Sequence, residues 1–471
     1  MSTVTLGPTR EAGRDRDRTR HRVVGRIRYL PLPVGWPLYA ALACYPVWWA
    51  LGLGSFALPL LSVPMVVELY RRRPIRVPKG FGVWLLFLVW VVASAAALDV
   101  SAPGTLEGDL GNRLLSSASR FLSYVAATAV LLYVGNLTEK EFPRRRLVAV
   151  LGLFFLEVMG LGLAALAWPK GQFTSPFEML LPGSLRHSDY VQQLVHPQMA
   201  QVMAVLGFSA GRPAAPFPYT NTWGDVVSVL LVWLVVWWWA WGSGRRRVLA
   251  AVTLAVAAVP IVYSLNRGVW IGLIVALVYV ALRMAIRGRG KVLAGVLAGM
   301  LAVGAIVIAT PLQTVIVDRI HNPHSNAGRA AQDDLAVEGA LHSPVIGYGS
   351  TRNMAGSRQS IAIGKSAKCP RCGNSSTGGA GQIWLLVFSQ GFAGAALYVG
   401  YFLLVLWRHR RDYSPIGVAG STAVVLSLVY LPFYGATGMP LTLTFVAVGL
   451  LWRNAAAAES RAPAPARGGT T

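Results

Sequence analysis

The chain has 471 residues, of which 54% are hydrophobic and 13% are charged, and its formal net charge is +24. Soluble domains carry about a quarter charged residues, so this composition excludes an ordinary soluble enzyme and indicates a membrane protein. The positive charge does not indicate a nucleic-acid partner, because much of it lies in short basic runs beside apolar segments, where such runs fix membrane topology: 71–73, 144–146, 245–247, 287–291 and 408–411.

Taken in chain order, residues 1–35 form an arginine-rich tail interleaved with acids. We interpret it as a disordered cytoplasmic tail that helps to set orientation, with attraction to anionic lipid as the alternative. About twelve apolar runs follow, each able to cross a bilayer core of about 30 Å as a helix: 36–52, 54–70, 81–98, 120–136, 147–168, 223–242, 249–264, 268–284, 292–309, 381–406, 416–433 and 439–452. The predicted fold is therefore an all-α polytopic membrane protein embedded in membrane lipids.

The basic runs orient these spans. With the N-terminus inside, every run named above falls on the cytoplasmic side, and both termini are cytoplasmic. The transmembrane regions are then 36–309 and 381–453, and residues 454–471 form a disordered cytoplasmic tail. Two long polar segments lie outside: 169–222, and a larger, partly helical loop at 310–380 between the ninth and tenth spans. Long structured loops are usually functional, so we expect a site at the outer surface.

Two arginines mark that site. Arg267 lies in a short break between two apolar spans, at the outer face, where a cation can receive a phosphate group. Residues 329–341 have a helical pattern, and Arg329 falls in its first turn, where free backbone N–H groups favour anions. A local salt bridge from Arg329 to Asp333 is the alternative for that side chain.

Four short motifs, in order, resemble those of the O-antigen ligase and polymerase family across about residues 215–400. They are the Pro216–Asn221 segment, the Ser264–Leu273 segment around Arg267, the Arg319, Arg329 and Ser343–Gly349 series, and the glycine pair in Ser389–Gly394. The family implies an inverting, metal-independent glycan transfer outside the bacterial cytoplasmic membrane, with no cofactor. Its donor is a polyprenyl-pyrophosphate-linked glycan, and its acceptor is a glycan or lipid hydroxyl.

The resemblance also implies roles for individual residues. Arg267 and Arg329 would hold the donor pyrophosphate and stabilise it as a leaving group. Arg319 would be a weaker third contact. The substrate-binding candidates beside it are Asn221, Tyr348 and Gln382.

One departure concerns the general base. The family carries a His-Asn pair before the glycine pair, but here residues 378–384 hold no histidine. Gln382 can position a hydroxyl group but cannot accept its proton at neutral pH. Other side chains that could act as base are found in the two outer loops: His321, His324, His342, Asp333 and Glu338, and more remotely His187 and His196.

The pair Cys369 and Cys372 resembles half of a zinc site, but four ligands are needed. On the oxidising side of the membrane we expect a local disulfide, with metal binding and free thiols as alternatives. Two other functions stay open. A lipid-linked oligosaccharide transporter or flippase is one, disfavoured because we see no internal repeat or convincing acidic residue in the spans. A non-catalytic partner in envelope polysaccharide assembly is the other.

Overall fold

A computed structural model describes residues 32–187, 189–203, 210–288, 312–321, 326–354 and 376–460, with a few isolated positions between 290 and 309. The described chain is mostly helical, as predicted. Seven of its helices are long and apolar enough to cross a membrane: α5 (Leu110–Asn136), α6 (Arg144–Ala167), α10 with its π-helical extension (Thr220–Ala240), α11 (Gly244–Tyr263), α12 (Arg267–Ile286), α16 (Gln382–His409) and α18 (Met439–Glu459). The predicted ninth span, 292–309, lies largely outside the described residues.

Two shorter apolar helices accompany them, α4 (Phe81–Ser94) with its 3-10 extension to Ala97, and α17 (Pro415–Tyr430). A buried aromatic cluster centred on Trp84 joins α4, α5, α16 and α18. Trp84 packs against Phe87, Tyr401 and Phe445, with ring centroids 4.8–5.4 Å apart. Aromatic side chains bury large areas, so this cluster fixes the spacing of the four helices.

The first predicted span, 36–52, is not a single helix. It divides into α1 (Trp36–Leu42) and α2 (Tyr45–Ala50), followed by α3 (Gly54–Arg71). Pro46 lies in the first turn of α2, where proline is tolerated but where it cannot continue a preceding helix. The prediction was wrong here because hydropathy counts apolar residues and does not weigh this interruption.

Helix α5 begins ten residues earlier than the predicted span at 120–136. Asp109 caps it by accepting a hydrogen bond from the backbone N–H of Asn112 at 3.0 Å. The additional turns carry serines and leucines in place of an uninterrupted apolar run. They extend the helix beside the outer segments rather than within the hydrophobic stretch.

The glycine pair in α16 has a structural role. Gly391 adopts φ +68°, a left-handed conformation that interrupts the helix, and a Cβ there would lie 2.6 Å from the carbonyl oxygen of Pro344. The interruption exposes backbone groups to the Ser343–Gly349 turn: Tyr348 N–H donates to Phe388 O at 3.0 Å, and Phe392 N–H donates to Pro344 O at 2.8 Å. Two of the family-like motifs therefore dock onto each other.

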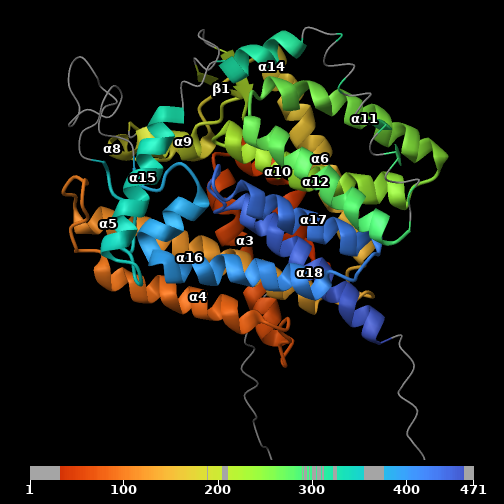
Figure 1. Ribbon diagram of the computed structural model, residues 1–471, viewed down its shortest axis with the longest axis horizontal. Coiled ribbons are helices and arrows are strands. Elements are labelled where there is room, and N and C mark those ends of the chain that lie inside the picture. Colours follow the sequence, from red (N-terminus) through yellow and green to blue (C-terminus); the bar gives the residue numbers. More distant parts are fainter. Residues whose placement is uncertain are drawn as a thin grey trace, which may run out of the picture. The chain divides into compact units, whose positions relative to one another are not determined.

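The outer segments fold into short elements. The first contains α7 (Pro176–Met179), α8 (Gly183–Arg186), α9 (Asp189–Val195) and an antiparallel pair, β1 (Ala200–Met203) and β2 (Ala210–Pro213), with Ala200 opposite Pro213. The second contains α14 (Leu312–His321) and α15 (Asn326–His342). Figure 1 shows α8, α9, α14, α15 and β1 on one side of the helices.

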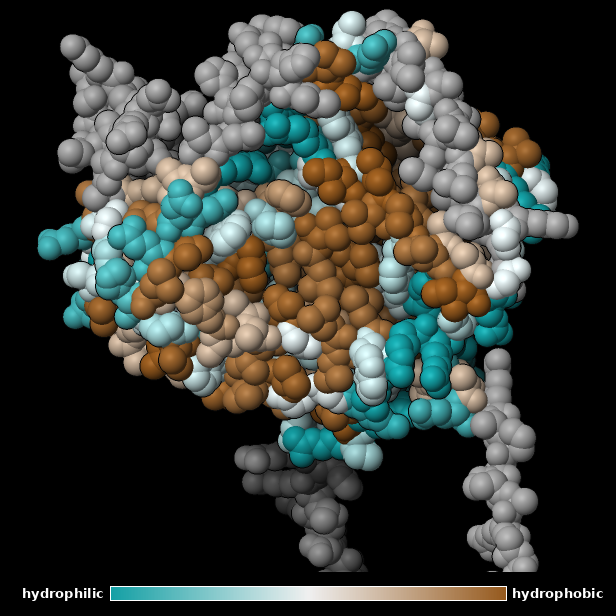
Figure 2. Space-filling model, viewed as in Figure 1, coloured by the Kyte–Doolittle hydropathy of each residue, from teal (hydrophilic) through white to brown (hydrophobic). Residues whose placement is uncertain are grey.

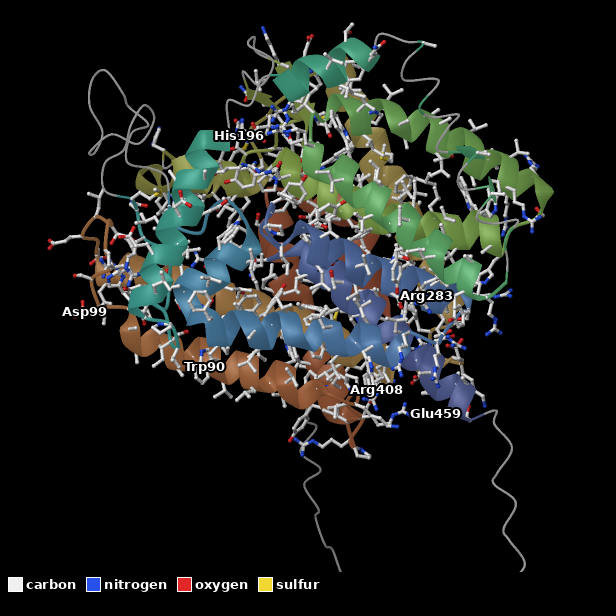
Figure 3. All side chains as sticks on the ribbon, viewed as in Figure 1. Trp90, Asp99, His196, Arg283, Arg408 and Glu459 are labelled. Carbon is white, nitrogen blue, oxygen red and sulfur yellow. The ribbon has the colours of Figure 1, made fainter. Side chains whose placement is uncertain are left out.

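The arginine runs meet at one end of the helices, which we call the arginine-rich end. Arg72 after α3 pairs with Glu141 at 2.9 Å, and Arg453 of α18 pairs with Glu139 at 2.8 Å. Arg283 of α12 donates to the carbonyl oxygen of Asp412 at 2.6 Å. Figure 3 shows Arg283, Arg408 and Glu459 together on the right, far from Asp99 and His196.

An apolar surface lies between the two ends. Figure 2 shows hydrophobic side chains across the middle of the visible face, with hydrophilic ones above and below. The outward-facing positions of α11 and α12 are large and aliphatic, including Val252, Val256, Ile274 and Leu277. A surface of this kind is stable in contact with lipid and not with water.

Candidate functional site

A cavity of about 1700 Å³ lies at the helix ends opposite the arginine-rich end. Its walls come from the beginnings of α3, α10 and α12, the first half of α5, β2, α14, α15 and the connection between α17 and α18. We call it the arginine cavity, because five arginines of the described chain line it: Arg120, Arg212, Arg267, Arg319 and Arg329. The three arginines expected to share a site, Arg267, Arg319 and Arg329, thus line the same space.

The break between α11 and α12 positions two of these arginines. Leu265 adopts φ +54°, which is rare for a residue with a branched side chain and turns the chain sharply. Carbonyl oxygens of the turn then accept hydrogen bonds: Ser264 O from Arg212 Nε at 2.7 Å, and Leu265 O from Arg319 Nε at 3.1 Å. Arg267 follows as the first residue of α12. One turn therefore gathers arginines from three elements.

These guanidinium groups lie close enough to affect one another. Burial, then Arg267 and Arg329, lower the pKa of Arg319. Burial, then Arg319, lower the pKa of Arg212 to about 10. A pKa of about 10 keeps the group protonated at neutral pH, so positive charge accumulates in a partly buried space. Such a concentration of cations stabilises an anion bound among them.

Asn221 belongs to the same wall. The Asn266 side-chain Nδ2 donates to Asn221 Oδ1 at 3.2 Å, and the Tyr434 hydroxyl donates to Asn266 Oδ1. Gly268 makes this approach feasible, because a Cβ there would lie 2.3 Å from the Tyr434 hydroxyl oxygen. The Asn-Arg-Gly sequence of the break thus joins the start of α10 to the loop after α17.

Gln382, by contrast, does not line the cavity. Its side chain is fully buried; Nε2 donates to the Tyr124 hydroxyl at 2.9 Å, and Oε1 accepts from Ala436 N–H at 3.0 Å. Its own N–H donates to Tyr434 O at 2.8 Å. Gln382 therefore holds the α17–α18 connection in place and supports the cavity wall from behind.

Tyr348 also lies outside the cavity. Its ring stacks on Phe388 with centroids 5.1 Å apart, and 3% of the residue is exposed. Gly347 and Gly349, both at positive φ, let the turn press this ring against α16. The motif Gly-Tyr-Gly is explained by packing, and Tyr348 is not among the residues that line the arginine cavity.

Sequence reasoning missed two cavity arginines. Arg212 lies in β2, within a loop rich in proline, and Arg120 lies in α5 at the edge of an apolar run. Nothing in either local pattern distinguishes them from structural or topology-setting arginines. It also missed a buried acid: Asp225 of α10 is 3% exposed, so the statement that the spans hold no convincing acidic residue was wrong. Asp225 is one helical turn beyond Asn221.

The candidate bases differ in whether they line the arginine cavity. Asp333 lines the cavity, one helical turn after Arg329, and within the described residues no ion pair joins the two. Glu338 and His342 are exposed on other parts of α15, and neither lines the cavity. His196 pairs with Glu178 at 2.8 Å in the first outer segment, and His187 of the same segment is exposed, with its Nδ1 2.6 Å from Gly183 O.

The remaining candidates fall on parts of the chain that are not described. These are His324, Cys369 and Cys372, together with the side chain of His321. The predicted disulfide therefore stays a prediction. Among the residues that the structure does describe, no group of three or more histidine, cysteine or acidic side chains could hold a metal ion.

Comparison with known proteins adds one finding. Residues 253–368 match the family described as O-antigen ligase. The matched segment contains Arg267, Arg319, Arg329 and Asp333. Searches of curated proteins and of solved structures found no match.

Proposed function

We propose that this protein, whose residues 253–368 match the O-antigen ligase family, is a membrane glycosyltransferase of the ligase or polymerase type. It transfers a glycan from a polyprenyl-pyrophosphate donor to an acceptor hydroxyl, with inversion at the anomeric carbon and without a metal ion. The acceptor is a glycan or lipid. Arg267 and Arg329 hold the donor pyrophosphate, and Arg319 and Arg212 add to the positive charge around it.

The observation that supports this proposal most is the convergence of these arginines on one cavity at the end of a helical membrane protein. A pyrophosphate leaving group gains negative charge as the glycosidic bond breaks. Guanidinium groups fixed in advance offset that charge without reorganising, and their planar donors match phosphate oxygens in pairs. The apolar exterior leaves the polyprenyl chain in lipid while its pyrophosphate reaches the cavity.

The proposed topology follows from the two ends of the helices. The arginine-rich end faces the cytoplasm under the positive-inside rule, which puts the arginine cavity on the outer face of the bacterial cytoplasmic membrane. With this orientation the chain crosses the membrane about twelve times, and both termini are cytoplasmic. The large loop at 310–380 then supplies Arg319 and Arg329 from outside.

Alanine substitution at Arg267 and at Arg329 tests the proposal. Membranes that contain the lipid-linked glycans of the source bacterium provide donor and acceptor, and product is measured as glycan transferred per molecule of folded protein. Removing one preorganised charge donor lowers rates by about 100-fold to 1000-fold. Arg246→Ala serves as the control, since Arg246 is an exposed arginine of α11 that does not line the cavity. Wild-type transfer rates in both variants would refute the assigned roles.

Asp225 favours a transporter of lipid-linked oligosaccharide. A carboxyl group buried in a membrane helix is a functional candidate by default, because burying it is costly. The two functions predict different results in sealed vesicles. Movement of a lipid-linked glycan across the bilayer, without any transfer product, would support the transporter and contradict the glycosyltransferase. If neither movement nor transfer occurred, the non-catalytic assembly partner would remain.

A further inference from the structure

We propose that Asp333 is the general base of the reaction and removes the proton from the acceptor hydroxyl as that oxygen attacks the donor sugar. This inference rests on the proposed glycosyltransferase function and adds to it the catalytic group that the sequence left unassigned. It also explains how a chain without the usual histidine before the glycine pair retains a base at the same cavity.

Among the described residues that line the arginine cavity, Asp333 is the one carboxylate, and none is a histidine. Glu338 and His342 lie on the same helix but are exposed and do not line the cavity. Helix geometry puts residues i and i+4 on one face. Asp333 therefore faces the same space as Arg329, one turn further from the start of α15.

Asp333 Oδ1 is buried and has no hydrogen-bond partner within the part of the chain that the structure describes. No ion pair with Arg329 occupies the group, so it is held beside the cations without being neutralised by them. A buried, unpartnered oxygen is costly. Retention of such a group in a cavity is expected where it has a chemical role.

The charges around Asp333 suit proton abstraction. On its own helix, Arg329 stabilises the carboxylate and Asp334 destabilises it. Across the cavity, the charged groups among the described lining residues are Arg120 on α5, Arg212 on β2, Arg267 on α12 and Arg319 on α14. Burial is the largest influence and raises the pKa of Asp333 to about 6, although Arg329 opposes that rise. A base works best when its pKa lies near the operating pH, and at neutral pH most of this group is ionised.

The acceptor oxygen forms a bond to the anomeric carbon while its proton passes to the Asp333 carboxylate. The bond from the anomeric carbon to the pyrophosphate oxygen breaks, and its electron pair stays on the pyrophosphate beside Arg267 and Arg329. Asp333 then loses the proton to water. No oxidant, metal ion or further reactant is needed.

Asp333→Asn and Asp334→Asn form a matched pair for the test. The two substitutions are chemically identical and adjacent, but Asp334 is exposed and does not line the cavity. Transfer is measured in membranes that contain the lipid-linked glycans of the source bacterium. Binding is measured separately on purified protein in nanodiscs, with undecaprenyl pyrophosphate as the probe.

Loss of a general base lowers a rate by about 100-fold to 10,000-fold. We expect Asp333→Asn to show a fall of at least about 100-fold in transfer, with binding of the probe retained or tightened, and Asp334→Asn to behave like wild type. Asp333→Glu keeps a carboxylate, and it should restore part of the activity with a shifted acid limb in the pH profile.

Three results would overturn the inference. Wild-type transfer by Asp333→Asn would show that another group takes the proton. Equal losses of transfer and probe binding in Asp333→Asn would assign the residue to binding or folding. A pH profile that keeps the same acid limb in Asp333→Glu would show that a different group titrates. Failure of the proposed function is distinguishable from all three, because in that case the wild-type protein itself would give no transfer product.

Discussion

The two ends of this molecule use arginine in different ways. At the arginine-rich end, Arg72, Arg144 and Arg453 each pair with a glutamate at 2.7–2.9 Å. At the cavity end, backbone carbonyls of the α11–α12 turn anchor Arg212 and Arg319, and five arginines share a space with the single carboxylate of Asp333 among the described lining residues. Pairing with acids stabilises the fold, whereas accumulation of like charge stabilises a ligand.

That difference explains why arginine content alone is a poor guide to function. The same side chain fixes topology at one end and forms a candidate anion site at the other. What separates the two uses is the surroundings: glutamates offset the positive charge at the arginine-rich end, whereas several guanidinium groups line one space at the cavity end. Substitutions at the two ends should therefore affect different properties of the protein.

The largest effect is expected from Arg319→Glu. The new carboxylate would lie beside Arg267 and Arg329, neutralise them and repel a pyrophosphate. Affinity for undecaprenyl pyrophosphate in nanodiscs should fall by more than about 100-fold, since the change both removes a charged hydrogen bond and adds a repulsive charge. Arg246→Glu, with the same charge change outside the cavity, should bind normally. If Arg319→Glu kept its affinity for undecaprenyl pyrophosphate, the proposed difference between the two ends would be contradicted.

Arg453→Ala, at the arginine-rich end, should lower the stability of the fold and leave ligand affinity unchanged. Arg453 is 6% exposed and donates to Glu139 at 2.8 Å and to Phe142 O at 2.7 Å. Its loss should lower the free energy of unfolding by about 2 kcal/mol, the usual contribution of charge-assisted hydrogen bonds. An SDS titration in micelles measures this. Affinity for undecaprenyl pyrophosphate per folded molecule should not change, and a parallel loss of affinity would show that the two ends are coupled.

A smaller effect concerns pH. The raised pKa of Asp333, about 6, means that its negative charge is present at pH 7.5 and removed as the pH falls to 5. Wild type should therefore bind undecaprenyl pyrophosphate about threefold to fivefold more weakly than Asp333→Asn at pH 7.5, and the two should converge at pH 5. The comparison of the two proteins cancels ionisation of the ligand itself. A ratio of the two affinities that stayed constant between pH 5 and pH 7.5 would contradict the raised pKa of Asp333.

The smallest effect is expected from Lys79→Ala. Lys79 and Glu459 approach to 3.7 Å, but their side chains are 70% and 72% exposed. Exposed pairs contribute less than about 1 kcal/mol, so the free energy of unfolding should change by no more than about 0.5 kcal/mol. A change comparable to that of Arg453→Ala would show that exposed pairing also stabilises this fold.

Much of the fold could be predicted from the sequence, because long apolar runs have few stable forms in lipid. Helices α3, α11, α12 and α18 begin within about five residues of the predicted spans. Local interruptions escaped that reasoning. Pro46 divides the first run, and Asp109 starts α5 early through a single hydrogen bond.

The candidate site could be predicted only where a local pattern pointed to it. Arg267 and Arg329 stood at a helix break and a helix start, and both line the cavity. Arg212 reaches the cavity only because β2 packs beside the α11–α12 turn, a contact that no local pattern encodes. Tyr348 was expected at the site because its motif is conspicuous in the sequence. In the structure that motif packs the turn against Phe388.

The most direct test of the central claim compares two ligands on two proteins. In nanodiscs, wild type should bind undecaprenyl pyrophosphate at least about 100-fold more tightly than undecaprenol, because the cavity arginines recognise the two phosphates. The double variant Arg267→Ala, Arg329→Ala should lose most of that preference while keeping its affinity for undecaprenol. An undiminished preference in the double variant would contradict the account.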